Sequence, residues 1–319
     1  MRTFLVTGGA GFIGSHIATA LVERGDRVRV LDNLCTGHLS NLNHIADSIE
    51  FIEGDVADPA VVATAVDGVD VVFHQAALAS VPRSVEKPLD TNHACVTGTL
   101  NMLDQARRAG VRRLVYAASS SAYGDQLASS KRETDLPMPI SPYGVAKLAG
   151  EYYCQAFTAT YGFETVAIRY FNVFGPRQDP DSPYSAVIPL FITALLSGKS
   201  PTIYGDGGQS RDFTYIDNVV HGNLLAADAN AAQAAGRVFN VANGRQVTLL
   251  EMLSKLQALL GTEIEPHFAD PRPGDIRESL ADISLARTLL KYEPQVDFDS
   301  GLERSIEYYR EMVGEQVSS

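Results

Sequence analysis

Tyr143 and Lys147 are the residues of this chain whose types and spacing best suit acid–base chemistry. They stand four positions apart in the run Ser-Pro-Tyr-Gly-Val-Ala-Lys at residues 141–147, and side chains at i and i+4 share one face of a helix. A phenol titrates at about pH 10 and is a poor base at neutral pH, but an adjacent ammonium favours the phenolate and lowers the phenol pKa. Two such residues alone are more often an ordinary helix surface. The interpretation therefore depends on the elements that would position them.

A glycine-rich turn near the amino terminus is the first such element. The apolar run 4–6 leads into Gly8, Gly11 and Gly14, and an amphipathic segment follows. Strand, glycine turn and helix in this order are the context in which a dinucleotide is bound, because the backbone can close on a pyrophosphate at a helix N-terminus. The simpler alternative is a tight strand–helix turn without a ligand. The glycine spacing is one residue wider than the usual dehydrogenase pattern.

Asp32 follows a second strand-like run, residues 28–31. A carboxylate at this place accepts hydrogen bonds from a ribose 2′-hydroxyl and repels a 2′-phosphate. The acid therefore agrees with the glycine turn and favours NAD over NADP.

The composition is typical of a soluble metabolic enzyme. With 319 residues, 45% of them hydrophobic and 20% charged, the chain can bury a large core in one α/β unit or two domains. A net charge of −12 argues against an extended nucleic-acid surface. No apolar run approaches the ~20 residues of a membrane span, and Met1-Arg2 leads straight into the first strand rather than into a signal peptide. We expect a cytoplasmic protein whose partners include neither nucleic acid nor membrane.

The three cysteines, Cys35, Cys95 and Cys154, are odd in number and far apart. This pattern favours reduced, buried thiols over a disulfide framework or a metal site. We therefore expect no metal.

Strand-like and helix-like segments alternate up to about residue 170, which predicts an α/β fold with a Rossmann-type doubly wound parallel sheet. Beyond it, loops interrupt helices near 186–197, 248–260 and 284–290, and we expect a smaller α/β substrate-binding lobe at the C-terminal end. The predicted domains are 1–170 and 171–312, with chain crossings between them, and a frayed polar tail at 313–319. Further strands are expected at 49–52, 69–74, 113–118 and 165–169, and further helices near 58–66, 91–109 and 143–160.

Many ordered motifs together resemble those of the extended short-chain dehydrogenase/reductases, and among them the nucleotide-sugar 4-epimerases of the UDP-N-acetylglucosamine or UDP-glucose type. The resemblance covers nearly all of residues 1–312. The matching stretches are Thr-Gly-Gly-Ala-Gly-Phe-Ile-Gly at 7–14, Asp-Asn-Leu at 32–34, Gly-Asp-Val at 54–56, His-Gln-Ala-Ala at 74–77, Ala-Ser-Ser-Ser-Ala-Tyr-Gly at 118–124, Arg-Tyr-Phe-Asn-Val-Phe-Gly-Pro-Arg at 169–177, Gly-Asp-Gly at 205–207, Arg-Asp-Phe at 211–213 and Arg-Pro-Gly-Asp at 272–275.

The resemblance implies a catalytic role for three residues and a tightly bound NAD. Tyr143 would take the proton of the sugar 4-hydroxyl, and Lys147 would hold the nicotinamide ribose and lower the tyrosine pKa. Ser119 would hydrogen-bond O4, although a serine at a strand end is, by position alone, more often a cap for the local backbone. The residues implied to hold the cofactor are Gly8, Gly11, Phe12, Ile13, Gly14, Asp32, Asn33, Asp55, Val56, Ala76, Ala77, Asn92, Tyr143, Lys147 and Tyr170.

The same resemblance implies a UDP-sugar substrate, with Arg211 and Arg272 facing the diphosphate. Two guanidiniums suit this task because they make bidentate, charge-assisted contacts, although isolated arginines are more often solvated surface charges. The residues implied to contact the substrate are Ser80, Arg83, Ser119, Ser120, Ser121, Tyr143, Asn172, Val187, Thr202, Tyr204, Arg211, Arg272, Asp275 and Ser279.

The residues after Ser119 favour epimerisation over elimination or decarboxylation. Related dehydratases and decarboxylases carry an acidic residue there, whereas this chain has Ser120 and Ser121. If NAD stays bound, a 4-keto sugar can turn over and be reduced on its other face. The alternatives that remain are a UDP-glucuronate decarboxylase or epimerase and a non-catalytic NAD-dependent sensor.

Ser279 bears on the identity of the sugar. It occupies a place where related epimerases have a tyrosine or a smaller residue beside C2 of the hexose, and a serine leaves room for an N-acetyl group. The stretch 79–84, with Ser80 and Arg83, also resembles epimerases that prefer N-acetylated sugars. We therefore favour UDP-GlcNAc and UDP-GalNAc over UDP-glucose and UDP-galactose, while Ser279 as a plain packing residue is the alternative.

The helices expected near 91–109 and 143–160 carry excess apolar residues. Related enzymes pair these helices in an intersubunit four-helix bundle, so the resemblance implies a homodimer. The simpler possibility is that these side chains face the chain's own sheet. The apolar residues in question include Leu100, Leu103, Tyr153 and Phe157.

Overall fold

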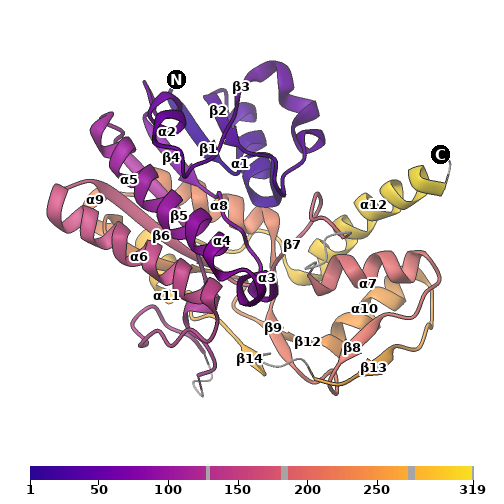
Figure 1. Cartoon of the computed structure of the whole chain (residues 1–319). Helices are drawn as coiled ribbons and strands as arrows, with labels where there is room; N and C mark the ends of the chain where they lie inside the picture. Colours follow the sequence, from indigo (N-terminus) through magenta and orange to yellow (C-terminus); the bar gives the residue numbers. More distant parts are fainter. Residues whose placement is uncertain (127–129, 181–185, 272–276, 318–319) are drawn as a thin grey trace.

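A computed structural model describes residues 1–126, 130–180, 186–271 and 277–317 of the chain (Figure 1). Its centre is a parallel seven-stranded sheet in the order β11-β6-β5-β4-β1-β2-β3. The strand order reverses beside β1, and in open parallel sheets this switch point is where ligands bind. The predicted Rossmann-type fold is confirmed. The strands are β1 (Thr3–Thr7), β2 (Arg27–Asp32), β3 (Ile49–Glu53), β4 (Val71–His74), β5 (Arg113–Ser119), β6 (Glu164–Tyr170) and β11 (Arg237–Val241).

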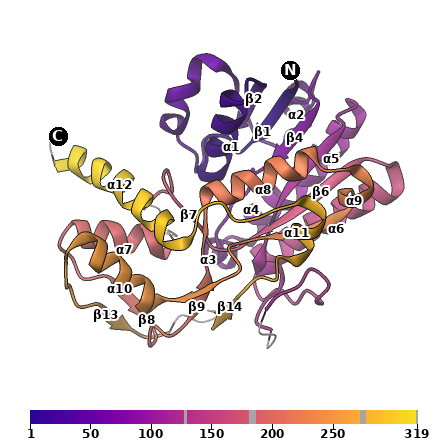
Figure 2. The same ribbon diagram turned by 180° about the vertical axis from the view of Figure 1, so that it is seen from behind.

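Helices cover both faces of the sheet because successive strand residues point to opposite sides. In β1, Phe4 belongs to the same core as Ile17 of α1, whereas Leu5 belongs to a second core with Met102 of α5. Figure 1 shows α5 and α6 on one face, and Figure 2 shows α1, α8 and α11 on the other. The helices of the two layers are α1 (Phe12–Glu23), α8 (Ile216–Asp228), α9 (Ala231–Ala234) and α11 (Ser284–Leu290), and α2 (Pro59–Ala65), α5 (Gly98–Arg108) and α6 (Pro142–Tyr161).

The helix expected near 91–109 is composite. It begins as α4 (Pro88–Asn92), passes through a π-helical turn, η2 (His93–Thr97), and continues as α5. One extra residue in a helical turn shifts the faces on either side of it, and such turns are frequent at functional sites. The short elements nearby are α3 (Val81–Glu86) and the 3₁₀ turns η1 (Leu39–Ser48) and η3 (Ser120–Ala122).

A smaller lobe lies beside the carboxyl edge of the sheet (Figure 1). It consists of short paired strands packed with helices, while β11, α8 and α11, which also follow residue 170, join the main sheet and its layers. The chain therefore passes between the two parts more than once. The elements of the lobe are β7 (Val173–Phe174), α7 (Val187–Leu196), β8 (Thr202–Tyr204), β9 (Ser210–Asp212), β10 (Thr214–Tyr215), β12 (Gln246–Thr248), α10 (Leu249–Leu260), β13 (His267–Ala269), β14 (Glu278–Ser279) and α12 (Phe298–Val317).

The last helix, α12, continues to Val317, so the tail expected from residue 313 includes its final turn. Its apolar face ends earlier, because Leu302, Ile306 and Tyr309 are its last fully buried large side chains among the described ones. The backbone can continue a helix by its own hydrogen bonds beyond the residues that pack. In the described part of the chain, no helix has both the length and the apolarity needed to span a membrane.

Candidate active site

The glycine turn connects β1 to α1 at the switch point of the sheet. Gly8 has φ of +65°, which glycine adopts without strain, and its amide donates to the carbonyl of Leu31 at 2.8 Å. Gly11 is the N-cap of α1 without any side-chain cap. A helix N-terminus with free amides is a ready site for a phosphate group, so the local structure suits the predicted dinucleotide.

Gly14→Ala is expected to abolish NAD binding and lower the melting temperature. A β-carbon at Gly14 would overlap the backbone carbonyl of Gly8, and the helix cannot move away without opening the turn. The control is Gly314→Ala, because Gly314 is also helical but has open space at its β-carbon position. Bound NAD in the purified protein and the melting temperature measure the effect. A Gly14→Ala protein with a full complement of NAD would contradict this account of the turn.

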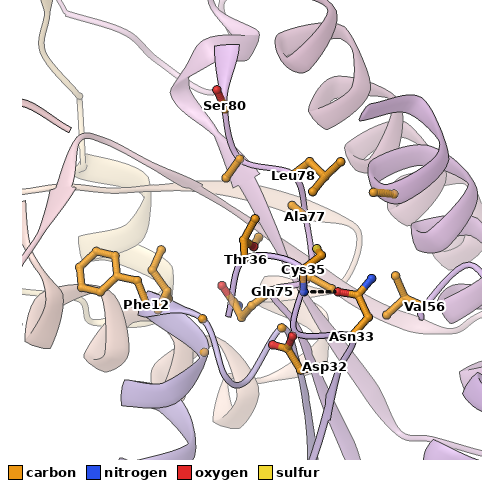
Figure 3. Close-up of a pocket in the computed structure, with 18 of the residues that line it drawn as sticks. Phe12, Asp32, Asn33, Cys35, Thr36, Val56, Gln75, Ala77, Leu78 and Ser80 are labelled. Atoms are coloured by element: carbon orange, nitrogen blue, oxygen red, sulfur yellow. Dashed lines mark hydrogen bonds between the residues drawn. The ribbon is translucent and has the colours of Figure 1, made fainter. Parts of the chain in front are cut away.

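A cavity of about 1280 Å³ opens at the carboxyl ends of β1, β2, β4 and β5. Figure 3 shows Asn33 and Val56 on one side of it, Phe12 on the other, and Ser80 at a further end. A volume of this size accommodates a ligand larger than a typical drug, and all fifteen residues that were expected to hold NAD line it. They are Gly8, Gly11, Phe12, Ile13, Gly14, Asp32, Asn33, Asp55, Val56, Ala76, Ala77, Asn92, Tyr143, Lys147 and Tyr170.

Asp32 is fixed at the end of β2 by two backbone amides. Its carboxylate accepts from the amide of Ala10 at 2.9 Å and from that of Leu34 at 2.8 Å. Burial raises the pKa of Asp32, and these amides oppose the shift. Beside it, the side-chain amide of Asn33 donates to Asp55 at 2.9 Å. The two acids and the asparagine fit the ribose and adenine end of a dinucleotide, because their oxygens can accept from hydroxyl and amino groups.

The predicted catalytic pair lies on α6, as the spacing of Tyr143 and Lys147 requires. The helix begins after Ser141, whose hydroxyl accepts from the amide of Gly144 at 3.1 Å, and Pro142 occupies its first turn. Both arrangements are strong helix starts. The first two turns of α6 therefore place the phenol and the ammonium at the wall of the cavity.

In the protein without NAD, Lys147 does not lower the pKa of Tyr143 as expected. Burial raises the pKa of Tyr143, Cys95 and Tyr170 raise it further, and a hydrogen bond with Ser119 lowers it. The Lys147 ammonium instead donates to the carbonyl of Ala117 at 2.8 Å, and burial lowers the pKa of Lys147. Desolvation of the charged form dominates here because Lys147 is almost fully buried and Tyr143 is partly buried at the wall.

Ser119 has the capping role that was the alternative for it, while its contact with O4 of a sugar stays a prediction. As the last residue of β5 it caps η3, since its hydroxyl oxygen accepts from the amide of Ser121 at 3.2 Å and from the hydroxyl of Ser121 at 2.9 Å. The same hydroxyl is the hydrogen-bonding partner of Tyr143. Ser120 and Ser121 form the 3₁₀ turn beyond it. The cap therefore orients the hydroxyl that meets the phenol.

A second cavity of about 510 Å³ lies in the smaller lobe and adjoins the first, because Ala186 lines both. Its apolar lining includes Phe174, Phe191 and Leu249, and a space of this kind can hold a planar base. The expected substrate residues that line it are Asn172, Val187, Thr202, Tyr204 and Arg211.

Other expected substrate residues have different places. Ser80 and Arg83 line the larger cavity, but the Ser80 hydroxyl also caps α3 by accepting from the amide of Arg83 at 3.1 Å. Ser279 is buried in β14, in register with Arg211 of β9. Arg272 and Asp275 lie outside the described residues.

Asn172, which lines the second cavity, is held in an uncommon backbone conformation. Its φ is +35°, a region in which asparagine is among the few tolerated residues. Its side chain donates to the carbonyl of Asp212 at 3.3 Å. Strain of this kind concentrates at binding sites.

Several cavity residues were missed from the sequence. Gln75 belongs to the His-Gln-Ala-Ala motif, and its side-chain oxygen accepts from the Tyr170 hydroxyl at 3.1 Å. That motif could have identified Gln75 from the sequence. Gln178 and Asp179 lie in a loop about 100 residues further along the chain, and no motif around them indicates that they line this cavity. The lining residues missed are Leu31, Cys35, Thr36, His38, Gly54, Gln75, Leu78, Ala79, Leu89, Asp90, His93, Ala94, Thr97, Ala117, Ala118, Gln178, Asp179 and Ala186. Of the three cysteines expected to be buried, Cys35 is exposed at this cavity, whereas Cys95 and Cys154 are buried.

Comparison with known proteins agrees with this geometry. The model of a family described as NAD dependent epimerase/dehydratase matches residues 4–242. A UDP-glucose 4-epimerase of Mycolicibacterium smegmatis is 37% identical over 97% of this chain and 99% of its own length. Two solved structures are similar over 98% of this chain and 99% of theirs. A UDP-N-acetylglucosamine 4-epimerase from Methanobrevibacter ruminantium, in complex with UDP-N-acetylmuramic acid, has 39% identity and a TM-score of 0.93. A UDP-glucose 4-epimerase from Thermotoga maritima, with UDP-glucose, has 37% identity and a TM-score of 0.92.

Proposed function

The chain belongs to the NAD-dependent epimerase/dehydratase family and is an NAD-dependent isomerase, and from this premise we propose that it is a UDP-sugar 4-epimerase. The observation that carries the proposal is the meeting of Tyr143 with Ser119 beside a cavity that suits a dinucleotide. The adjoining apolar cavity, which Arg211 also lines, supports a nucleoside diphosphate as part of the substrate, because an apolar wall suits a base and a guanidinium suits a phosphate.

In the proposed reaction, Tyr143 removes the proton from the sugar 4-hydroxyl and returns it after the sugar has turned over. Ser119 hydrogen-bonds the same oxygen and passes the proton between it and the phenol. Lys147 lies 6.0 Å from the centroid of the Tyr143 ring, and in the proposed reaction its positive charge opposes the burial that raises the pKa of the phenol. When bound, NAD supplies the hydride acceptor for C4 and the hydride that reduces the 4-keto sugar. The residues fit this chemistry because a base and a cofactor cavity share one wall.

Among UDP-sugars, the proposal gives UDP-GlcNAc and UDP-GalNAc priority over UDP-glucose and UDP-galactose. The support is the small side chain of Ser279, which is buried and stands in register with Arg211 at the second cavity. A larger side chain there would compete for space with the substituent at C2 of a hexose. Pocket walls of this kind discriminate by roughly 1–3 kcal/mol.

Ser279→Tyr is expected to reduce kcat/KM for UDP-GlcNAc by on the order of 100-fold while leaving UDP-glucose turnover within a few-fold, because the phenol would fill space used by the N-acetyl group. Ser284→Tyr is the control, since Ser284 is exposed at the start of α11. Coupled assays with the two substrates measure the ratio. Equal loss for both sugars would remove Ser279 from the selectivity argument.

The purified protein, incubated with UDP-GlcNAc and no added NAD, is expected to form UDP-GalNAc of unchanged mass. Resident NAD makes addition unnecessary, because the cofactor is restored in each cycle. Chromatography with mass spectrometry measures the product. Loss of water or CO₂ would instead indicate a dehydratase or a decarboxylase, and absence of any product with UDP-GlcNAc, UDP-glucose and UDP-glucuronate would favour a binding role.

The decarboxylase and dehydratase alternatives are weakened by η3. Ser120 and Ser121 occupy the positions after Ser119, and Ser121 directs its hydroxyl back to Ser119 at 2.9 Å. Neither hydroxyl can act as the carboxylate that elimination at C5 requires. Simple redox chemistry at one carbon is the reaction that this arrangement supports.

We also propose a homodimer formed through α5 and α6. Leu103 and Phe157 do not contribute, because both are buried in the chain's own core. The support is the exposure of Leu100 and Tyr152, at 36% and 52%, on the outer faces of these helices. Sedimentation velocity tests the proposal, and a single species of 34.4 kDa would contradict it.

A further inference from the structure

A buried hydrogen-bond chain runs beneath the larger cavity through His74. The amide of Ala76 donates to the Thr7 hydroxyl oxygen at 3.3 Å, and that oxygen lies 2.8 Å from Nδ1 of His74. On the other side of the ring, Nε2 lies 3.0 Å from the Thr99 hydroxyl oxygen, which lies 2.6 Å from the carbonyl of Cys95. His74 and both threonines are 0–1% exposed. The chain therefore connects β1, β4 and α5 without water.

Counting protons along the chain assigns the tautomer of His74. The Cys95 carbonyl can only accept, so the Thr99 hydroxyl proton is committed to it. Nε2 must then carry a proton and donate it to Thr99. The neutral ring consequently has a bare Nδ1, which accepts the proton of the Thr7 hydroxyl. Each hydroxyl donates once and accepts at least once, so every partner in the chain is satisfied.

The surroundings keep this imidazole neutral. Burial, with a smaller contribution from the charge of Lys147, lowers the pKa of His74 to about 3. The Tyr116 ring lies between the two groups, 6.0 Å from the His74 ring and 5.2 Å from the Lys147 ammonium. A second cation here would repel Lys147, which has to remain charged to favour the phenolate of Tyr143. The neutral state thus suits the catalytic pair as well as the hydrogen-bond chain.

Each threonine is buried behind a segment that lines the cofactor cavity. Thr7 immediately precedes Gly8 of the glycine turn, and Thr99 lies just beyond the π-helical turn η2, where Cys95 accepts its proton. Residues of that turn, such as His93 and Thr97, line the cavity. His74 itself is followed directly by lining residues 75–77. One side chain therefore links three parts of the cavity wall.

We propose that His74, held as the Nε2–H tautomer, is a positioning residue for NAD: it fixes the separation between the glycine turn and the π-helical turn. The role rests on the cofactor of the family and not on which sugar is turned over. Breaking either hydrogen bond of the ring leaves a buried polar group unsatisfied, and the walls that hold NAD are then free to shift.

The tautomer is tested by nitrogen NMR on protein labelled with ¹⁵N-histidine. The chain has seven histidines, and the His74 signals are assigned by their loss in His74→Gln. We expect the ring of His74 to carry its single proton on Nε2. We also expect the ring to stay neutral down to about pH 5, where an ordinary histidine is already protonated. A proton on Nδ1, or a cationic ring at pH 6, would overturn the proposal. This readout does not depend on activity.

The positioning role is tested by Thr7→Val and Thr99→Val, which keep the shape of the side chain and remove the hydroxyl. Thr165→Val is the matched control, because Thr165 is also fully buried and donates to a helix carbonyl, that of Cys154, at 2.8 Å. Protein loaded with radiolabelled NAD is chased with excess unlabelled NAD. Thr7→Val and Thr99→Val are each expected to release the labelled NAD on the order of tenfold faster than Thr165→Val does. The three variants are compared at the same interval below their melting temperatures. Equal release from all three would reduce His74 to a plain core residue and overturn the proposal.

Discussion

Replacing Tyr143 with phenylalanine is expected to lower kcat for epimerisation by about 10³-fold while leaving NAD bound. General acid–base catalysis contributes roughly 10²–10⁴-fold, and in this chain the phenol at the cavity wall is the group that meets Ser119. Phenylalanine keeps the ring, so the cavity keeps its shape and only the proton-transferring oxygen is lost. The measurement is steady-state turnover of the UDP-sugar together with the NAD content of the purified variant.

Tyr161→Phe is the matched control for this change. Tyr161 is the last residue of the same helix, is 54% exposed and does not line either cavity, so loss of its hydroxyl should leave kcat within about twofold of wild type, as is usual for surface changes. If Tyr143→Phe retained more than about a tenth of the wild-type kcat, another group would have to be the base. If the variant lost NAD as well as turnover, the phenol would be shown to hold the cofactor rather than the proton.

The parts of the site that the sequence predicts are those whose geometry is local. Residues four apart on a helix share a face whatever the rest of the fold does, so the spacing alone places Tyr143 and Lys147 together. The glycine turn is equally local, because Gly8 and Gly14 satisfy a single strand–turn–helix unit. The run of apolar strands alternating with helices was enough for the fold class, since parallel sheets require helical crossovers.

The parts that the sequence does not predict depend on distant contacts. His74 meets Thr7 across 67 positions, and the Gln75 side chain meets Tyr170 across 95. Such pairs are fixed by strand register and side-chain rotamers, which no spacing rule supplies. The raised pKa of Tyr143 is a further case: the pattern shows a cation one turn away, but the burial that outweighs it belongs to the tertiary structure.

A buried ion pair between α6 and the sheet is another contact that the sequence does not predict. Glu151 stands one turn beyond Lys147 on α6, and its carboxylate accepts from Arg169 of β6 at 2.9 and 2.7 Å. Both side chains are almost completely buried, and the guanidinium also lies 4.4 Å from the centroid of the Tyr123 ring. Glu151 and Arg169 are 18 positions apart, and the sequence could not pair them, because neither α6 nor β6 alone shows which of its faces is buried.

Glu151→Ala is expected to destabilise the protein by about 3–5 kcal/mol, because it leaves the Arg169 guanidinium buried without its counter-charge. The double variant Glu151→Leu/Arg169→Met should recover most of this loss, since apolar residues of similar volume often replace a buried pair at little cost. Chemical denaturation measures both.

The pair of Arg29 and Glu50, 2.8 Å apart at the surface with the Glu50 side chain 59% exposed, provides the control. Because Glu50 is well exposed, Glu50→Ala should cost no more than about 1 kcal/mol. A loss of that small size for Glu151→Ala would mean that water reaches Arg169 in the folded protein. A double variant as unstable as the single one would mean that the pair, and not the packing around it, holds α6 against the sheet.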